Sequence, residues 1–563
     1  MSSSPDSAAT SAAHPASEND TRGIGGHPRG LTTLFFTEMW ERFSYYGMRA
    51  LLMLFMVKAA AEGGLGFETK KAAAIYGTYT MSVYLLSILG GFIADNFIGA
   101  RRAVLVGGII IATGHFTMAF GSIPTFYTGL VLIALGTGLL KPNISSMVGS
   151  LYSPTDERRD AGFSIFYMGI NIGAFISPLV TGYLAQSAGW KARLVSWGID
   201  PAHSWHWGFG AAGVGMTLGL IVYLIKRETL AHVGAKPEKG ESFPHWPFYV
   251  APLVALVVWA TELSGFVSPS TSLLTLVLIG LLFIVWFAKE GRFMSAGLTV
   301  PARWRNLFFV AIGSVALIAA MKLSDTYPAI VYALFAVQVA AILFFASRPD
   351  PDSKRIAAIL VFFFAAEIFW AIFEQTGSSI SLFADSKTNN IAFGYAFPSS
   401  WWQSVNAIWV ILLAPLFALM WTSLGARQFS SPMKFVMGLL FVSVSFLLMV
   451  PAAKLTAAGS VSPLWLVGLF FLQTVGEMFL SPVGLSTMTK LAPKRLVGLM
   501  MGIWFLAAAL GNKLAGVLAG HFESTNADDL ANFFLKQALL AAGATLALLA
   551  CVPWVKRLMG GVR

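Results

Sequence analysis

Residues 91–102 read GFIADNFIGARR, starting inside the apolar stretch 72–98 and ending just before the apolar stretch 103–121. Each stretch is long enough to cross the hydrocarbon core of a bilayer as an α-helix, which takes about 20 residues. The turn between them carries Asp95 and ends in two arginines. Such a turn is typical of the polar end of a membrane-spanning hairpin, where the aspartate caps a neighbouring helix terminus and the arginines stay in the cytoplasm.

Apolar stretches of this length repeat along the whole chain. Their side chains do not alternate with period two, as the strands of an outer-membrane barrel would, so we expect an all-α polytopic membrane protein. The sixteen candidate spans are 31–57, 72–98, 103–121, 125–149, 161–185, 205–226, 247–263, 272–288, 306–321, 327–346, 357–383, 400–424, 433–452, 463–489, 497–519 and 531–555.

The composition excludes most other classes of protein. Hydrophobic residues make up 56% of the 563 residues and charged residues 12%, whereas soluble domains carry about 25% charge. Too little polar material remains to cover several soluble domains. The single cysteine, Cys551, excludes an internal disulfide and a cysteine-based metal site.

The formal net charge of +11 first suggests a nucleic acid as partner. The basic residues are, however, spread over many short loops, and most of them fall on the side of the N-terminus. This bias follows the positive-inside rule. It predicts cytoplasmic termini in a multi-pass protein of the inner (plasma) membrane, and it removes the support for nucleic-acid binding.

The apolar stretches divide into two groups of six around a middle insertion, as in transporters built from repeated halves. The insertion has four apolar stretches, so either sixteen helices cross the membrane or two of the four do not. The predicted parts are a disordered cytoplasmic tail 1–30, an N-terminal six-helix bundle 31–226, an inserted linker 227–356 with up to four apolar helices, and a C-terminal six-helix bundle 357–557.

The first span carries an unusual number of charged residues. It contains Glu38, Glu41, Arg42 and Arg49, which with two tyrosines fall within an arc of roughly 140° on a helix with about 100° per residue. An ionisable side chain in the bilayer costs at least ~2.5–3.5 kcal/mol, so this face must line a polar interior. A purely structural ladder of ion pairs is the alternative reading.

Further charged residues lie within spans, among them Lys141 beside Pro142, Glu374, and Glu477 between a glycine and a proline. The first half of the chain is therefore rich in buried cations (Arg42, Arg49 and Lys141), and the second half has buried anions (Glu374 and Glu477). A ligand with a carboxylate at one end and an ammonium at the other fits between them. A zwitterion is the simplest such ligand, although polarity alone does not name one.

Residues 91–102 resemble the signature loop of the major facilitator superfamily, and the other motifs resemble one family within it, the proton-dependent oligopeptide transporters. The resemblance rests on Glu38-x-x-Glu41-Arg42-Phe43-x-Tyr45-Tyr46, residues 163–174 (FSIFYMGINIGA), the Lys141 segment, Phe-Trp…Glu374-Gln375, Gln403-Ser404-x-Asn406, Gly476-Glu477…Ser481-Pro482 and Trp504. These matches follow one another in order from about residue 27 to residue 520.

The resemblance implies a major facilitator fold with additional inserted helices and a proton-coupled symporter that imports di- and tripeptides by alternating access. It implies that the proton gradient is the only energy source, with no cofactor, no metal and no catalytic residue, and that the transporter works as a monomer. The implied proton-coupling residues are Glu38, Glu41, Arg42, Lys141 and Glu374. The implied substrate-binding residues are Arg49, Tyr45, Tyr46, Tyr84, Lys141, Asn171, Asn406, Glu477, Ser481 and Trp504, and the implied gating loop contains Gly91, Asp95, Arg101 and Arg102.

Two departures from the family pattern stand out. Ala407 follows Asn406 where a proline is usual, and bacterial members usually have fourteen spans. A transporter of another anionic or zwitterionic solute on the same fold is the nearest alternative. A membrane-embedded enzyme is a more distant one, because no span contains a nucleophile–base pair or a metal-binding cluster.

Overall fold

The computed structural model describes residues 20–153, 156–235, 329–492, 497–523 and 525–561. Almost all of these residues are helical, and the described residues contain one small sheet, the hairpin of β1 (Ile391–Ala392) and β2 (Tyr395–Ala396). The all-α membrane fold predicted from the hydropathy is confirmed. Three of the four predicted stretches of the insertion, 247–263, 272–288 and 306–321, lie outside the described residues.

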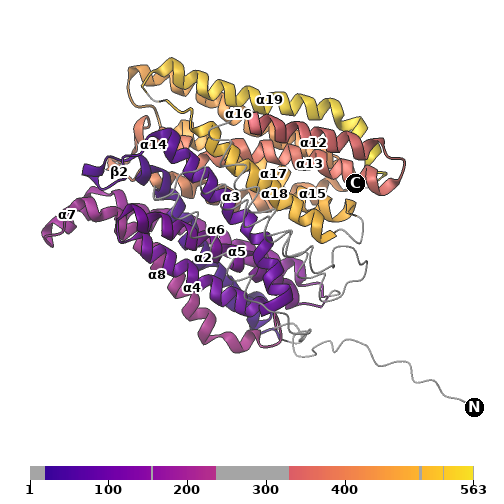
Figure 1. The fold of residues 1–563 in the computed structure, drawn as a ribbon, viewed down its shortest axis with the longest axis horizontal. Coiled ribbons are helices and arrows are strands. Elements are labelled where there is room, and N and C mark those ends of the chain that lie inside the picture. The colour runs from indigo at the N-terminus through magenta and orange to yellow at the C-terminus, as the bar shows by residue number, and fades with distance from the viewer. Residues whose placement is uncertain (1–19, 154–155, 236–328, 493–496, 524, 562–563) are drawn as a thin grey trace, which may run out of the picture.

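The first half of the chain forms one helical bundle (Figure 1). Its helices are α2 (Arg29–Val57), α3 (Thr69–Ile93), α4 (Ala100–Met118), α5 (Ile123–Ser150), α6 (Arg159–Gln186), the short α7 (Ala188–Ser196) and α8 (Ser204–Ile225). Local sequence sets their ends: at α5, for example, the Ser122 side chain accepts a hydrogen bond from the Thr125 backbone N–H, and Pro124 follows in the first turn.

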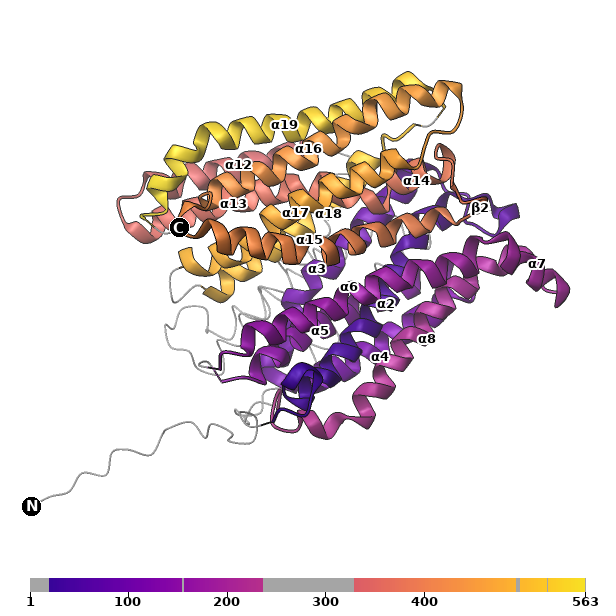
Figure 2. The same ribbon diagram turned by 180° about the vertical axis from the view of Figure 1, so that it is seen from behind.

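The second half forms a second bundle beside the first (Figure 2). Its helices are α12 (Ala329–Ser347), α13 (Pro351–Phe373), the short α14 (Ser379–Ser386), α15 (Gln403–Leu424), α16 (Ser431–Leu455), α17 (Leu464–Leu491), α18 (Val497–Ala519) and α19 (Ala527–Leu558). Helix α12 corresponds to the fourth predicted stretch of the insertion, 327–346, and packs on α13.

Nine segments among the described residues are long and apolar enough to cross a membrane. Helix α2 is not one of these nine, although its 29 residues exceed the length required, because it carries the charged residues noted above. An unusually charged helix of this length inside a bundle of apolar helices indicates a polar interior.

The predicted span 357–383 is interrupted in the structure. Helix α13 ends at Phe373, a tight 3-10 turn, η6 (Glu374–Gly377), follows, and α14 resumes the chain. The carbonyl of Thr376 that this break releases accepts hydrogen bonds from Gln403 Nε2 at 2.7 Å and from Ser381 Oγ at 2.9 Å. Irregular backbone at membrane depth requires such partners, and apolar patterning does not reveal them.

The two bundles converge towards the end that carries α14 and β2 and diverge towards the end that carries the termini (Figures 1 and 2). Helices α3 and α18 pack across this boundary. Their backbones meet at Gly77 and Gly516, where a Cβ on Gly77 would lie 2.9 Å from the Gly516 Cα. Only glycine permits this close approach.

Candidate functional site

Three charged side chains on one turn of α2 form a buried cluster. Arg42 Nε lies 3.0 Å from Glu38 Oε1, and Arg42 is also paired with Glu41. None of the three residues exposes more than 3% of its surface. One guanidinium faces two carboxyl groups, so this trio is electrically neutral when one carboxyl group carries a proton.

Lys141 of α5 supplies a second cation near this cluster. It interacts electrostatically with Glu38 and Glu41, and its Nζ lies 3.9 Å from the centre of the Tyr84 ring. Pro142 follows it inside the helix. With Lys141 charged, both glutamates are balanced without a bound proton.

Arg49, two turns further along α2, pairs across the boundary between the two halves. Its guanidinium forms an ion pair with Glu374 in η6, and its Nε donates a hydrogen bond of 2.6 Å to the Tyr76 hydroxyl on α3. Arg49 and Glu374 expose 7% and 3% of their surfaces. The break after α13 therefore places the carboxylate opposite α2.

The carboxylate of Glu477 on α17 is held by a neighbouring helix. Asn406 Nδ2 of α15 donates to Glu477 Oε2 at 3.3 Å and to Thr474 Oγ1 at 3.0 Å. The alanine at position 407 does not prevent this contact. Glu477 is half-buried, and one of its oxygens is not used by this bond.

Tyr46 lies within electrostatic range of all these groups. Its phenol interacts electrostatically with the two cations Arg42 and Arg49, and it also interacts with the carboxylates Glu374 and Glu477. The ring of Tyr45 lies beside it at 5.2 Å between centroids. The structure thus brings the charged residues of α2 close to charged residues of the second half.

Three predicted substrate-binding residues lie apart from this network. Asn171 donates to the Tyr167 carbonyl of its own helix at 2.9 Å, Ser481 is half-buried, and the Trp504 ring packs against Gly484 and Phe435. Among the described residues, no hydrogen bond or ion pair joins these three to the charged residues of α2.

The predicted gating loop forms a five-residue π-helical turn, η3 (Ala94–Ile98), between α3 and α4. Asp95 is exposed, and Gly99, the N-cap residue of α4, leaves this helix without a side-chain cap. Two hydrogen bonds hold the backbone of Arg101. Its N–H donates to the Gly234 carbonyl at 3.1 Å, and its carbonyl accepts from the Tyr223 hydroxyl at 2.9 Å.

Other polar residues of the interior were not predicted from the sequence. Tyr76 binds Arg49, Lys513 Nζ donates to Thr78 Oγ1 at 3.0 Å, and Glu367 is 3% exposed. Glu367 lies two helical turns before Glu374 in the same apolar stretch, so the rule that singles out Glu374 could have found it. Nothing in the pattern around Tyr76 indicates its partner.

At the end away from the termini, side chains of one half bind the backbone and side chains of the other. The hydrogen bonds run from Gln186 to Ser399 (3.0 Å), from Ser400 to Gln186 (3.1 Å), from Trp401 to Leu179 (3.1 Å) and from Ser404 to Phe175 (2.7 Å). Because these bonds join α6 to η7 (Ser399–Trp402) and α15, they hold the two bundles together at this end.

Within the described ranges, no group of three or more His, Cys, Asp or Glu side chains is placed to hold a metal ion.

Comparisons with known proteins agree with one another. The chain is 38% identical to the peptide transporter YePEPT of Yersinia enterocolitica and 36% identical to a di-/tripeptide transporter of Lactococcus lactis, in both cases over 96% of this chain and 97–98% of the relative. A crystal structure of a mutant of peptide transporter POT in complex with alafosfalin covers 97% of this chain and 99% of its own, with a TM-score of 0.75 and 36% identity. The family model "PTR2: POT family" matches residues 101–252 and 275–535. The chain belongs to the POT family of peptide transporters, and the predicted family and major facilitator fold are confirmed.

Proposed function

We propose that this chain is a proton-coupled symporter that imports di- and tripeptides by alternating access. It crosses the plasma (inner) membrane many times, keeps both termini in the cytoplasm and works as a monomer. The observation that carries the proposal is the pair of arginine sites on α2, one buried with two glutamates and one paired with Glu374 of the other half.

Charge balance explains how a proton enters the cycle. A buried group of charges is costly unless its charges cancel. Glu38, Glu41 and Arg42 need either Lys141 or a bound proton for balance. A peptide carboxylate that draws Lys141 away from the glutamates therefore makes proton binding at Glu38 or Glu41 more favourable. Binding of the peptide and binding of the proton are coupled in this way.

The amino end of the peptide binds to the second half of the chain. The half-buried Glu477 carboxylate, oriented by Asn406, provides a negative charge for the peptide ammonium. Arg49 and Lys141 provide positive charges for its carboxylate. A substrate of this kind spans the boundary between the bundles, with Tyr45, Tyr46, Tyr84, Asn171, Ser481 and Trp504 lining the space around its side chains.

The Arg49–Glu374 pair supplies the gate. It lies between the halves on the converging side, with the hydrogen bonds from α6 to η7 and α15. Protonation of Glu374, or competition from a peptide carboxylate for Arg49, weakens this link and favours separation of the bundles at that end. With cytoplasmic termini, the structure corresponds to a state that is closed on the outside.

Counterflow in liposomes tests the substrate class. Proteoliposomes loaded with a dipeptide are expected to exchange it for labelled dipeptides and tripeptides and not for free amino acids or nitrate. Competition by free amino acids or nitrate as strong as that by dipeptides would show that the alternative, another anionic or zwitterionic solute, is correct. Accumulation that does not respond to collapse of the proton gradient would disprove the coupling.

A further inference from the structure

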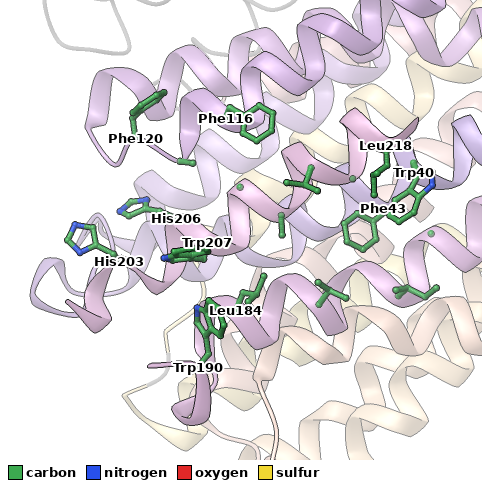
Figure 3. Close-up of a pocket in the computed structure, with 18 of the residues that line it drawn as sticks. Trp40, Phe43, Phe116, Phe120, Leu184, Trp190, His203, His206, Trp207 and Leu218 are labelled. Carbon is green, nitrogen blue, oxygen red and sulfur yellow. The ribbon is translucent and has the colours of Figure 1, made fainter. Parts of the chain in front are cut away.

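A groove of about 970 Å³ runs along the outer face of the first bundle. Its walls come mainly from α6 and α8, with the end of α4 and Trp190 of α7 at one end (Figure 3). Its floor includes Met39, Trp40 and Phe43 of α2. On a helix with about 100° per residue, these three residues lie on average about 130° around from the centre of the face of Glu38 and Arg42, so the groove is separate from the charged network.

The groove faces the membrane. Val180 of α6 and Val214 and Leu218 of α8 line it and expose 39%, 52% and 37% of their surfaces. Both helices are among the segments long and apolar enough to span a bilayer. An apolar groove on such a surface is in contact with acyl chains and not with water.

The length of the groove matches one leaflet. Along α8 it extends from His203, just before the helix, to Leu218. Fifteen helical steps of about 1.5 Å give roughly 22 Å. Half of a bilayer with its head groups is about 20–22 Å thick, so the groove extends from the membrane surface to the bilayer centre.

The surface end of the groove carries polar atoms without a protein partner. Trp190 Nε1 and His206 Nδ1 are buried and have no hydrogen-bond partner among the described residues. Trp190 packs edge-on against Trp207 at 5.5 Å between centroids, and tryptophan is typical of the membrane interface. Figure 3 shows His203, His206 and Trp190 at this end and Trp40, Phe43 and Leu218 at the other.

Two basic residues follow Trp190 in the sequence, although neither lines the groove. The same short helix that supplies Trp190 carries Lys191 and Arg193. An unpaired indole N–H and a histidine, with two cations on the short helix beside them in sequence, are groups that suit a phosphate. The apolar end complements an acyl chain, so the two ends together have the polarity of one phospholipid.

We propose that this groove binds one phospholipid of the outer leaflet, with an acyl chain along α8 and the phosphate at Trp190 and His206. The acyl chain gains nothing from the hydrophobic effect, because the surrounding lipid is equally apolar. Selective binding comes from packing in the groove and from the hydrogen bonds at the surface end. The bound chain lies against Trp40 and Phe43 and so supports α2 from behind the charged cluster.

Photo-crosslinking tests the site and the orientation of the lipid. The full chain is reconstituted in phosphatidylethanolamine–phosphatidylglycerol vesicles with a trace of phosphatidylglycerol that carries a diazirine on one acyl chain. A diazirine at the methyl end is expected to label Trp40, Phe43 and Leu218, and one near the glycerol to label Leu184 and Trp190. Enrichment over the lipid-facing side of α19 is expected to be about three- to tenfold, which corresponds to one or two hydrogen bonds in a membrane.

A matched pair of variants separates specific binding from general lipid contact. A Cβ at Gly210 meets nothing within 4 Å, and the same holds for Gly543 on α19. A leucine at position 210 therefore begins in open space and extends into the groove, and Gly210→Leu is expected to remove the enrichment, whereas Gly543→Leu is expected to leave it unchanged. Trp190→Phe keeps the ring but removes the donor, and is expected to lower the enrichment about threefold. Size-exclusion chromatography verifies that each variant is folded.

Three outcomes would overturn the proposal. They are equal labelling of the groove and of α19, enrichment that persists in Gly210→Leu, and crosslinks between two copies of the chain at the groove in place of lipid adducts. The last outcome would identify a second protein molecule as the occupant.

Discussion

Arg42 and Arg49 lie two turns apart on the same face of α2, yet their partners are of different kinds. Arg42 pairs with Glu38 and Glu41 of its own helix, whereas Arg49 pairs with Glu374 of the other half. In the proposed cycle, the first group lies within one helix, and its charge balance changes when a proton binds or Lys141 moves. In the same cycle, the second pair breaks when the halves separate. One helix thus carries a site suited to sensing protons and a site suited to sensing conformation.

The largest expected effect concerns Glu38. Glu38→Gln keeps the size of the side chain but removes a carboxyl group that can accept a proton, while Arg42 retains Glu41. We expect proton-driven peptide accumulation to be abolished and counterflow exchange to persist. Uptake into proteoliposomes with and without an imposed pH gradient measures both. Undiminished accumulation would remove Glu38 from the coupling site.

Replacing each arginine compares the two sites in stability. Arg42→Met leaves two buried carboxyl groups without their arginine, which costs about 3–5 kcal/mol. Arg49→Met leaves only Glu374, and Tyr76 loses its donor. We therefore expect the thermal unfolding temperature in detergent to fall further for Arg42→Met than for Arg49→Met. Equal decreases would show that the cross-bundle pair contributes as much to stability as the pair within α2.

Glu374→Gln tests the conformational role of the second site. Removal of one partner of a buried charge pair costs about 2–5 kcal/mol, which is enough to change which conformation dominates. In a Cys551→Ser background, spin labels at Trp197 and Phe393, both exposed at the converging end, are expected to move apart in this variant. Glu62→Gln is the control, because its exposed pair with Lys58 contributes about 0–1 kcal/mol and lies within one half. A distance distribution that Glu374→Gln leaves unchanged would contradict the gate.

The smallest effect is expected for Tyr76→Phe. This change removes one hydrogen bond to Arg49 but leaves the ion pair with Glu374. A hydrogen bond to a charged group contributes about 1.5–3 kcal/mol, so a partial increase in the population with separated labels is expected. An effect as large as that of Glu374→Gln would indicate that the tyrosine, and not the carboxylate, holds Arg49.

The sequence predicts local relations and misses distant ones. The spacing of Glu38, Glu41 and Arg42 places them on one face of one helix, which the structure shows as a cluster. The contact between Arg49 and Glu374 joins residues 325 positions apart, and no periodicity connects them. The two were predicted as site residues separately, in different roles, and their pairing was not.

The interruption at η6 was missed for a related reason. The mean hydropathy of 357–383 predicts one continuous span, although residues 374–379 (EQTGSS) are mostly polar. The break is made possible by Gln403 and Ser381, which bind the released carbonyl of Thr376. Gln403 lies outside this segment, so the pattern of residues 357–383 alone does not indicate that it is a partner.

The contact between Gly77 and Gly516 is a pivot point for the proposed rocking of the two bundles. Gly77 is eight residues from the start of α3 and sixteen from its end, which gives lever arms of about 12 Å and 24 Å at 1.5 Å per residue. If the bundles rock rigidly about this point, the end of α3 near the termini moves about twice as far as the other end. A small displacement of the helix ends at the outer gate then produces a displacement about twice as large on the cytoplasmic side.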